Sequence, residues 1–318
     1  MKKESELYQF YKSELLSSLK MLETERKTIV NKLIIALAII ICTVAFFLLL
    51  IGFSNFNLCV FIALIGSIIY GFLYKFITAN FVINFKDNII CRIINFIDKV
   101  LQYYPKGYID KSKFLLSGIF TQSVDEYTGD DHVIGRIDKT SIEFSELEAK
   151  HVTRDSKGRK HTTKIFHGLF FIADFNKDFN SALVVLPDTA QALFGKFGQT
   201  LQSINFTRKG ELIKLEDPEF EKLFAVYGNN QIEARYILSP ALMERIKEFK
   251  KKSGKKIFLS FIASKVFVAI DYNRNLFEPG IWNSLIDFEP VKEYFKDLTA
   301  AIGIVEDLNL NLRIWSKE

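Results

Sequence analysis

A long uncharged stretch, from Leu33 to Tyr74, constrains this chain more than any other feature. It contains no Asp, Glu, Lys, Arg or His and consists mainly of Leu, Ile, Phe, Val and Ala. A bilayer core is about 30 Å thick, and a helix of roughly 20 apolar residues crosses it. The stretch therefore predicts two membrane spans, near residues 33–53 and 58–76. The residues between them, Ser54 to Asn57, follow Gly52 and are typical of a turn.

Two other interpretations of the stretch are weaker. A buried core helix of a soluble protein is usually shorter and carries polar residues on one face, and a secretory signal has a shorter apolar region at the extreme N-terminus. Here a polar, charged leader of about thirty residues comes first. A two-pass membrane hairpin is the favoured prediction.

The charges beside the spans predict the orientation of the chain. Basic residues stand before the first span and after the second, while the turn between the spans has none: Lys20, Arg26, Lys27 and Lys32 precede, and Lys75, Lys86 and Arg92 follow. Because positive charge is retained on the cytoplasmic side, both termini are expected in the cytoplasm.

Small residues form a stripe on each predicted span. The stripes are Ala38, Cys42 and Ala45 in the first span and Ala63, Ser67 and Gly71 in the second. Spacings of three and four residues place each set on one helical face, where two backbones approach closely. The stripes are expected to pack the hairpin together, with association between chains, and hence a homo-oligomer, as the alternative.

Composition limits the partners of the remaining chain. The 42 basic and 37 acidic residues give a net charge of +5, which is too balanced for a nucleic-acid binder but suits a domain beside an anionic leaflet. The three cysteines have no metal-binding spacing and predict no disulfide framework, in keeping with a cytoplasmic domain. We divide the chain into a leader helix (1–32), the hairpin (33–76), a helix beside the membrane (77–107) and a cytoplasmic domain (108–318).

The leader has the pattern of an amphipathic helix over residues 4–31. One stripe of it is apolar: Leu7, Tyr11, Leu15, Leu19 and Leu22. Because the polar face mixes both signs of charge, docking on the folded domain or a coiled coil between chains is favoured over lying flat on lipid. After the second span, a broad apolar stripe from Ile89 to Tyr104 predicts a core-facing helix that ends at Pro105.

The domain itself is predicted as α+β with a mainly antiparallel sheet. Alternating residues indicate strands at 133–137, 142–147 and 162–175. The stretch 151–161 between the last two is a hairpin tip and the most basic local feature. Its residues Arg154, Lys157, Arg159 and Lys160, with the adjoining Lys150, are candidates for contact with anionic headgroups or an acidic partner. A solvated loop is the plainer interpretation of the tip.

The rest of the chain alternates helices and strands. Helices are expected after Asp188, at 218–223, from the Ser239 cap to about Lys252, and from about 290 to 307, with strands at 181–186, 211–215, 224–227, 231–238, 255–262, 265–272 and 308–314.

Several short motifs, taken in order, resemble one family. They are Gly118-Ile119-Phe120, Gly129-Asp130-Asp131 with Gly135, Phe144-Ser145-Glu146-Leu147, Ile165-Phe166-His167-Gly168-Leu169-Phe170, Ala173-Asp174-Phe175-Asn176-Lys177, Glu233-Ala234-Arg235 with Ser239-Pro240, and Phe277-Glu278-Pro279. The chain is similar, from its leader to Trp315, to the bacterial domain-of-unknown-function family numbered 3137, some of whose members are labelled galanin. The resemblance implies a two-pass protein of the bacterial inner membrane with a cytoplasmic domain, and it implies no catalytic residues.

Candidate chemistry is sparse. A membrane-tethered, metal-assisted hydrolase using His132, His167 and Asp131 is the rival hypothesis, although these residues share no recognised ligand spacing. Gly129-Asp130-Asp131 is interpreted as turn chemistry before a strand. We expect no catalytic residues and no cofactor.

These observations favour a non-enzymatic scaffold or binding protein. We expect it to be anchored in the inner membrane and to engage the lipid bilayer and another protein, but no nucleic acid. A transporter or channel subunit is disfavoured because the spans carry no ionisable residue.

Overall fold

The computed structural model describes residues 4–51, 56–175, 177–188, 211–272 and 274–310. The chain divides into two compact units: residues up to Ile93 with Phe277–Phe295, and Ile94–Leu276 with the residues from Lys296 onward. The fold is α+β, with long apolar helices in the N-terminal part and an antiparallel sheet in the C-terminal part, as the sequence predicts.

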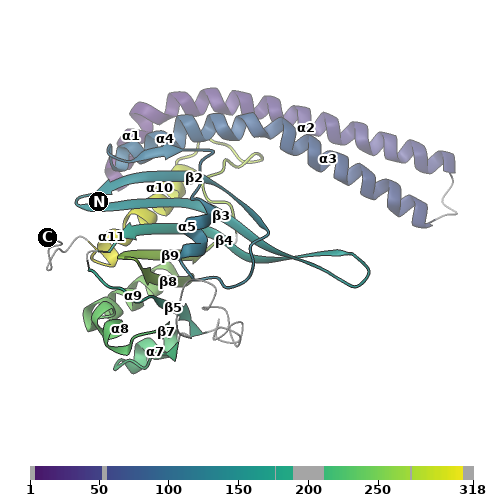
Figure 1. Ribbon diagram of the computed structural model, residues 1–318. Helices are drawn as coiled ribbons and strands as arrows, with labels where there is room; N and C mark the ends of the chain where they lie inside the picture. Colours follow the sequence, from purple (N-terminus) through teal and green to yellow (C-terminus); the bar gives the residue numbers. More distant parts are fainter. Residues whose placement is uncertain (1–3, 52–55, 176, 189–210, 273, 311–318) are drawn as a thin grey trace. The chain divides into compact units, whose positions relative to one another are not determined.

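The first unit is built on two long helices that lie side by side (Figure 1). One runs through α1 (Glu4–Phe10), a π-helical turn (Tyr11–Leu15) and α2 (Leu16–Ile51); the other runs through α3 (Phe56–Phe85), a π-helical turn (Lys86–Ile90) and α4 (Cys91–Ile97). Both are long and apolar enough to cross a membrane by length and composition. The predicted turn between them falls partly on residues 52–55, outside the described residues.

The helix beside the membrane ends earlier than predicted. It ends at Ile97 rather than at Pro105, and Gln102–Tyr104 forms strand β1. The Asp98 side chain accepts a hydrogen bond from the amide of Val100 at 2.9 Å, which favours a turn there. The strand then pairs with β2, so tertiary pairing overrides the helical spacing of this segment.

The described residues of the second unit are organised by a nine-stranded antiparallel sheet in the order β1-β2-β3-β4-β9-β8-β5-β7-β6. After β1, the strands are β2 (Glu126–Ile137), β3 (Thr140–Arg154), β4 (Lys160–Asp174), β5 (Leu183–Pro187), β6 (Glu211–Leu212), β7 (Phe224–Gly228), β8 (Lys256–Ile262) and β9 (Lys265–Asp271). The predicted hairpins at 142–175 and 255–272 are confirmed by the β3–β4 and β8–β9 pairs.

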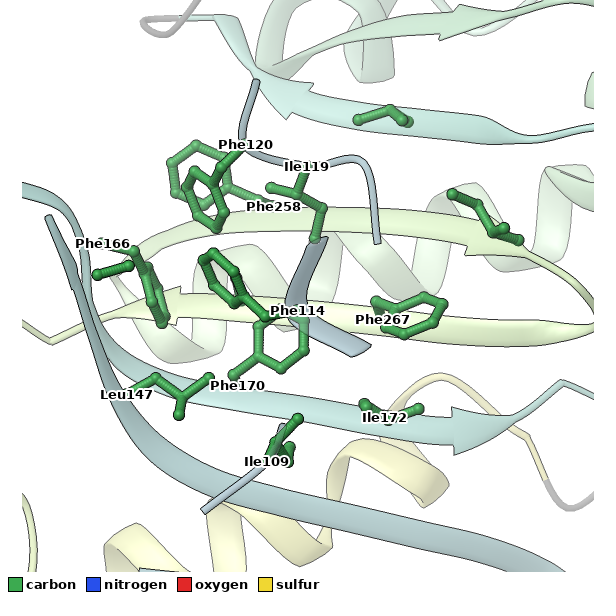
Figure 2. Close-up of a cluster of buried hydrophobic side chains, with 14 of the residues drawn as sticks. Ile109, Phe114, Ile119, Phe120, Leu147, Phe166, Phe170, Ile172, Phe258 and Phe267 are labelled. Carbon is green, nitrogen blue, oxygen red and sulfur yellow. The ribbon is translucent and has the colours of Figure 1, made fainter. Parts of the chain in front are cut away.

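One face of this sheet carries a Phe-rich core (Figure 2). Phe114, on the short helix α5 (Lys111–Leu116), lies at its centre, with its ring centroid 5.1 Å from that of Phe170 and 5.2 Å from that of Phe120. Alternate residues of the strands point to one face of a sheet, which is why Phe166, Phe170 and Ile172 of β4 all join this cluster.

One predicted strand is a helix. Residues 231–238 form α8 (Gln231–Ile237) instead. The Asn230 side chain caps this helix by accepting hydrogen bonds from the amides of Ile232 and Glu233 at 3.0 and 3.2 Å. Ala234 and Ile237, spaced by three, form its buried side. The apolar residues of this segment therefore follow the period of a helix and not the alternation of a strand.

The other helices of this unit follow their local sequence. They are α7 (Pro218–Leu223) and α9 (Pro240–Ser253), together with α10 (Phe288–Ile302), which the division between the units crosses, and α11 (Ile304–Asp307). Ser239 caps α9 and Gly254 ends it with φ +62°, as expected. Leu308 and Leu310 enclose a turn at Asn309 instead of starting the predicted closing strand. The helix expected after Asp188 and the remainder of that strand lie outside the described residues.

Candidate functional site

The paired helices α2 and α3 expose an extended apolar surface. Leu49, Phe72 and Phe76 have exposed fractions of 74%, 74% and 82%, and many of their apolar neighbours are exposed too. Isolated exposed apolar residues are ordinary on a protein surface, but a continuous apolar surface marks contact with lipid or protein. This surface is the largest candidate site in the first unit.

The contact between α2 and α3 differs from the expected one. The predicted small residues, Ala38, Cys42, Ala45, Ala63, Ser67 and Gly71, are all exposed. The helices meet instead at Gly66, where a Cβ atom would lie 3.1 Å from a Val44 methyl and 3.2 Å from an Ile40 methyl. Because Gly66 has no side chain, two β-branched residues fit against its backbone. Association between chains through the small-residue stripes stays a prediction.

The leader helix packs against other residues of the same chain. All five residues of its predicted apolar stripe, from Leu7 to Leu22, are buried. Its aromatic residues pack on the segment Phe277–Phe295: the rings of Tyr8 and Tyr11 lie 5.1 and 5.2 Å from that of Phe288, and the Tyr11 hydroxyl donates to the carbonyl of Ile286. The leader helix is thus a docked element of the first unit.

A buried ion pair fixes this docking, and we call it the leader latch. Glu23 and Arg26 are 4% and 9% exposed. Arg26 donates to both carboxylate oxygens of Glu23, at 2.8 and 2.6 Å, and to the carbonyl of Ile281 at 2.9 Å. The amide of Leu285 donates to Glu23 at 3.0 Å. The hydrogen bonds from Arg26 outweigh burial and hold the pKa of Glu23 below its usual value.

Three carboxylates gather in the second unit at a bulge in β2, which we call the acidic bulge. It consists of Asp130, Asp131 and Glu146, whose ligand atoms lie within 4.8 Å of one another. The β2–β3 register shifts between Asp130 and Val133, and Asp131 has φ +56°. Gly129-Asp130-Asp131 therefore lies inside a strand, and its expected turn before the strand is a bulge within it.

Protein donors reach the acidic bulge. The hydroxyl of Tyr103 donates to Asp131, the amide of Leu276 donates to Glu146 at 2.8 Å, and His167 Nε2 lies 3.2 Å from a Glu146 oxygen. Carboxylate oxygens suit a hard divalent cation, but these donors already explain why two of the carboxylates tolerate burial. Hydrogen bonds within the protein therefore explain the acidic bulge without a bound cation.

The residues of the rival hydrolase hypothesis do not form one group. His167 joins the acidic bulge through Glu146, whereas His132 Nε2 lies 3.0 Å from Glu143, which Lys113 also contacts at 2.7 Å. Glu143 and Glu146 are three residues apart on β3 and so point to opposite faces. Burial of Glu143 opposes its ionisation, but the hydrogen bonds from His132 and Lys113 prevail and lower its pKa.

The basic hairpin tip has the predicted form. Beyond the flanking strands, β3 and β4 continue as a two-stranded ribbon (Figure 1), and Asp155 closes its turn by accepting from the amides of Lys157 and Arg159 at 2.9 and 2.8 Å. Gly158 supplies the left-handed position, with φ +76°.

Nearby carboxylates neutralise part of the tip. Lys150 pairs with Glu148 at 2.7 Å, Arg159 with Asp155 at 3.6 Å, and Lys160 with Glu126 at 2.5 Å. Arg154 and Lys157 are exposed and make no ion pair among the described residues. They are the cations that the tip offers to a partner.

Sequence reasoning missed a serine, histidine and aspartate that meet at the end of β3. His151 Nδ1 lies 2.8 Å from Ser123 Oγ and 2.8 Å from Asp125 Oδ2. A catalytic triad needs the serine at one ring nitrogen and the carboxylate at the other, whereas here both contact the same atom. Asp125 also accepts from the amide of Val152 at 2.7 Å, so the group anchors the end of the strand.

Comparisons with known proteins agree in part with the resemblance. The model of one family, described as Protein of unknown function (DUF3137), matches residues 164–310, a shorter range than the near-whole chain that the motifs implied. No curated protein matches the chain. The crystal structure of the mycobacterial trehalose monomycolate transport factor A, TtfA, is similar with 10% identity and a TM-score of 0.32, over 66% of this chain and 92% of that one; a score this low supports no argument.

Proposed function

We propose that this chain, whose residues 164–310 match the DUF3137 family model, is a membrane-anchored, non-enzymatic binding protein. Helices α2 and α3 anchor it in the bacterial inner membrane. The α+β unit lies on the cytoplasmic side, where its hairpin tip engages a protein or anionic headgroups.

The exposed apolar surface of α2 and α3 carries this proposal. Exposing side chains such as Leu49 and Phe76 to water costs about 25 cal/mol for each Å² of apolar surface, and a bilayer removes that cost. The two helices also satisfy their own backbone hydrogen bonds, as a segment in lipid must. The hairpin is therefore more stable in a bilayer than in water.

The basic tip supports the second half of the proposal. Arg154 and Lys157 project from a ribbon that continues beyond the strands that flank it. A cation near an anionic leaflet contributes about 1 kcal/mol to attraction, and the same charges attract an acidic protein surface.

One experiment tests anchoring and binding together. A photo-crosslinking residue replaces Lys157 in the full-length chain expressed in bacterial cells, and a matched chain carries it at Lys251 on α9. We expect both chains to resist alkaline carbonate extraction, and the Lys157 position to give a protein or lipid adduct that is missing at Lys251. Extraction by carbonate contradicts the anchor; equal adducts at both positions contradict the role of the tip.

A further inference from the structure

The loop 277–287 is attached to α2 just before the uncharged stretch begins. The leader latch holds it there, through the carbonyl of Ile281 and the amide of Leu285. Arg26 precedes Leu33 by seven residues, which is about 10 Å along a helix. The loop is therefore fixed within roughly two helical turns of the start of the first predicted span.

The same loop is also linked to α3, through a residue of α10. The carbonyl of Glu278 accepts a hydrogen bond from Tyr294 at 2.8 Å, and the ring of Tyr294 lies 5.6 Å from that of Phe85 on α3. The loop is thus bound to α2 through Arg26 and linked through Tyr294 to Phe85 of α3, which lies beyond the predicted end of the second span at Phe76.

Trp282 is the large apolar side chain that this loop exposes, beside the exposed Glu278, Gly280, Asn283 and Asp287. Phe277, Pro279, Ile281 and Leu285 are all buried, whereas the larger Trp282 side chain is 56% exposed. An indole ring is apolar but carries an N–H donor, and such residues concentrate at the boundary between hydrocarbon and water.

Exposed lysines mark the same level of the two helices. Lys32 adjoins the first span and Lys75 lies next to Tyr74 in the second. Lysines at the ends of spans extend their ammonium groups toward the phosphates of the headgroups. An exposed Trp with two exposed cations, all at one end of the hairpin, is the composition of a membrane–water interface.

We propose that the loop 277–287 is a third contact with the bilayer, in which Trp282 inserts its ring into the headgroup region of an anionic leaflet. This inference rests on the proposed anchoring of α2 and α3. Lipid is favoured over a protein partner because Arg26 holds the loop about 10 Å from the start of the first predicted span, at the end of the hairpin where Lys32 and Lys75 are exposed. The loop thereby ties the leader helix to the membrane surface through the leader latch.

Quenching by brominated lipids tests the depth of Trp282. Trp315, the other tryptophan of the sequence, is replaced by Phe, and the full-length chain is reconstituted in anionic vesicles with bromine near the top or near the end of the acyl chains. We expect bromine near the top to quench Trp282 emission at least twofold more than bromine near the end.

The matched control places the single tryptophan at another exposed position of the first unit, far from the predicted spans. Tyr8→Trp in a Trp282→Phe, Trp315→Phe background places an indole at a position that is 42% exposed but about 37 Å before Leu33 along the helix, and we expect no quenching there. Trp282 emission that neither lipid quenches, in a chain that resists carbonate, overturns the inference alone. A chain that carbonate extracts overturns both the inference and the proposed anchor.

Discussion

Glu23 shows how much one residue determines in the first unit. Its carboxylate is nearly enclosed and accepts from Arg26 and from the amide of Leu285. Glu23→Gln leaves the buried guanidinium of Arg26 without a charged partner, which costs about 3 kcal/mol. We expect the amide of Leu285 to exchange its hydrogen on the order of 100-fold faster in the variant.

Lys27→Gln is the matched control for this prediction. Lys27 reaches the same carboxylate at 4.0 Å but its side chain is 69% exposed, so its loss changes stability by less than about 0.5 kcal/mol. Equal exchange rates at Leu285 in the wild type and in Glu23→Gln would show that the leader latch does not hold the loop.

The same carboxylate predicts a pH dependence with a definite sign. The pKa of Glu23 is lowered from 4.5, mainly by the hydrogen bonds from Arg26. A group with a lowered pKa stabilises the folded state above its unfolded pKa, and that contribution is lost as the pH falls through the folded value. Protection of the Leu285 amide, corrected for its intrinsic exchange rate, is therefore expected to fall below pH 4.5 in the wild type and to stay constant in Glu23→Gln.

Among single residues, the sequence predicted the buried stripe of the leader but not the leader latch. Leu7, Leu15 and Leu22 share a helical period that is visible without any partner. The partners of Glu23 and Arg26 include backbone groups of Ile281 and Leu285, and no local pattern encodes a backbone group so distant along the chain.

Among the elements, β4 depends on a glycine at its crossing with β9. A Cβ atom on Gly168 would lie 2.2 Å from the carbonyl oxygen of Ile270 and 2.8 Å from the amide nitrogen of Tyr272. Gly168→Ala is therefore expected to destabilise the second unit by about 3 kcal/mol, measured as a lower urea midpoint of the near-ultraviolet circular dichroism transition. Gly280→Ala, whose nearest neighbour would be 3.4 Å away, is the control, and an equal shift in both variants would contradict the argument.

Elements were predictable where local chemistry decides them. Ser239 and Gly254 bound α9, and the turn at Asp155 closes the long hairpin, so their sequences alone were sufficient. The end of α4 and the identity of α8 were not predictable, because pairing of β1 with β2 and burial of Ala234 and Ile237 decide them. The acidic bulge was not predictable for the same reason, since a register shift depends on the opposite strand.

For the whole molecule, the charges beside the hairpin predict one orientation. In a chain whose three native cysteines are replaced by Ala, single cysteines are placed at Asn57, which is exposed at the start of α3, and at Lys252 on α9. We expect an impermeant maleimide added to intact spheroplasts to label Asn57→Cys but not Lys252→Cys, because basic residues keep both termini inside. Labelling of Lys252→Cys from outside would reverse the orientation.

Division of the chain into units was the least predictable level. The sequence predicts that residues 277–295 belong to one domain from 108 to 318, whereas the structure groups that segment with the leader. Apolar periodicity indicates that a stripe needs a partner but does not identify the partner.

Docking of the leader on Phe277–Phe295 also has a consequence for biosynthesis. Arg26 of the leader is synthesised 255 residues before its partner Ile281, so this part of the docking surface stays uncovered while the intervening chain is made. During that interval a chaperone or lipid must shield Tyr8 and Tyr11, and a product that ends before residue 277 would lack the segment that packs on them and would be a ready target for proteolysis.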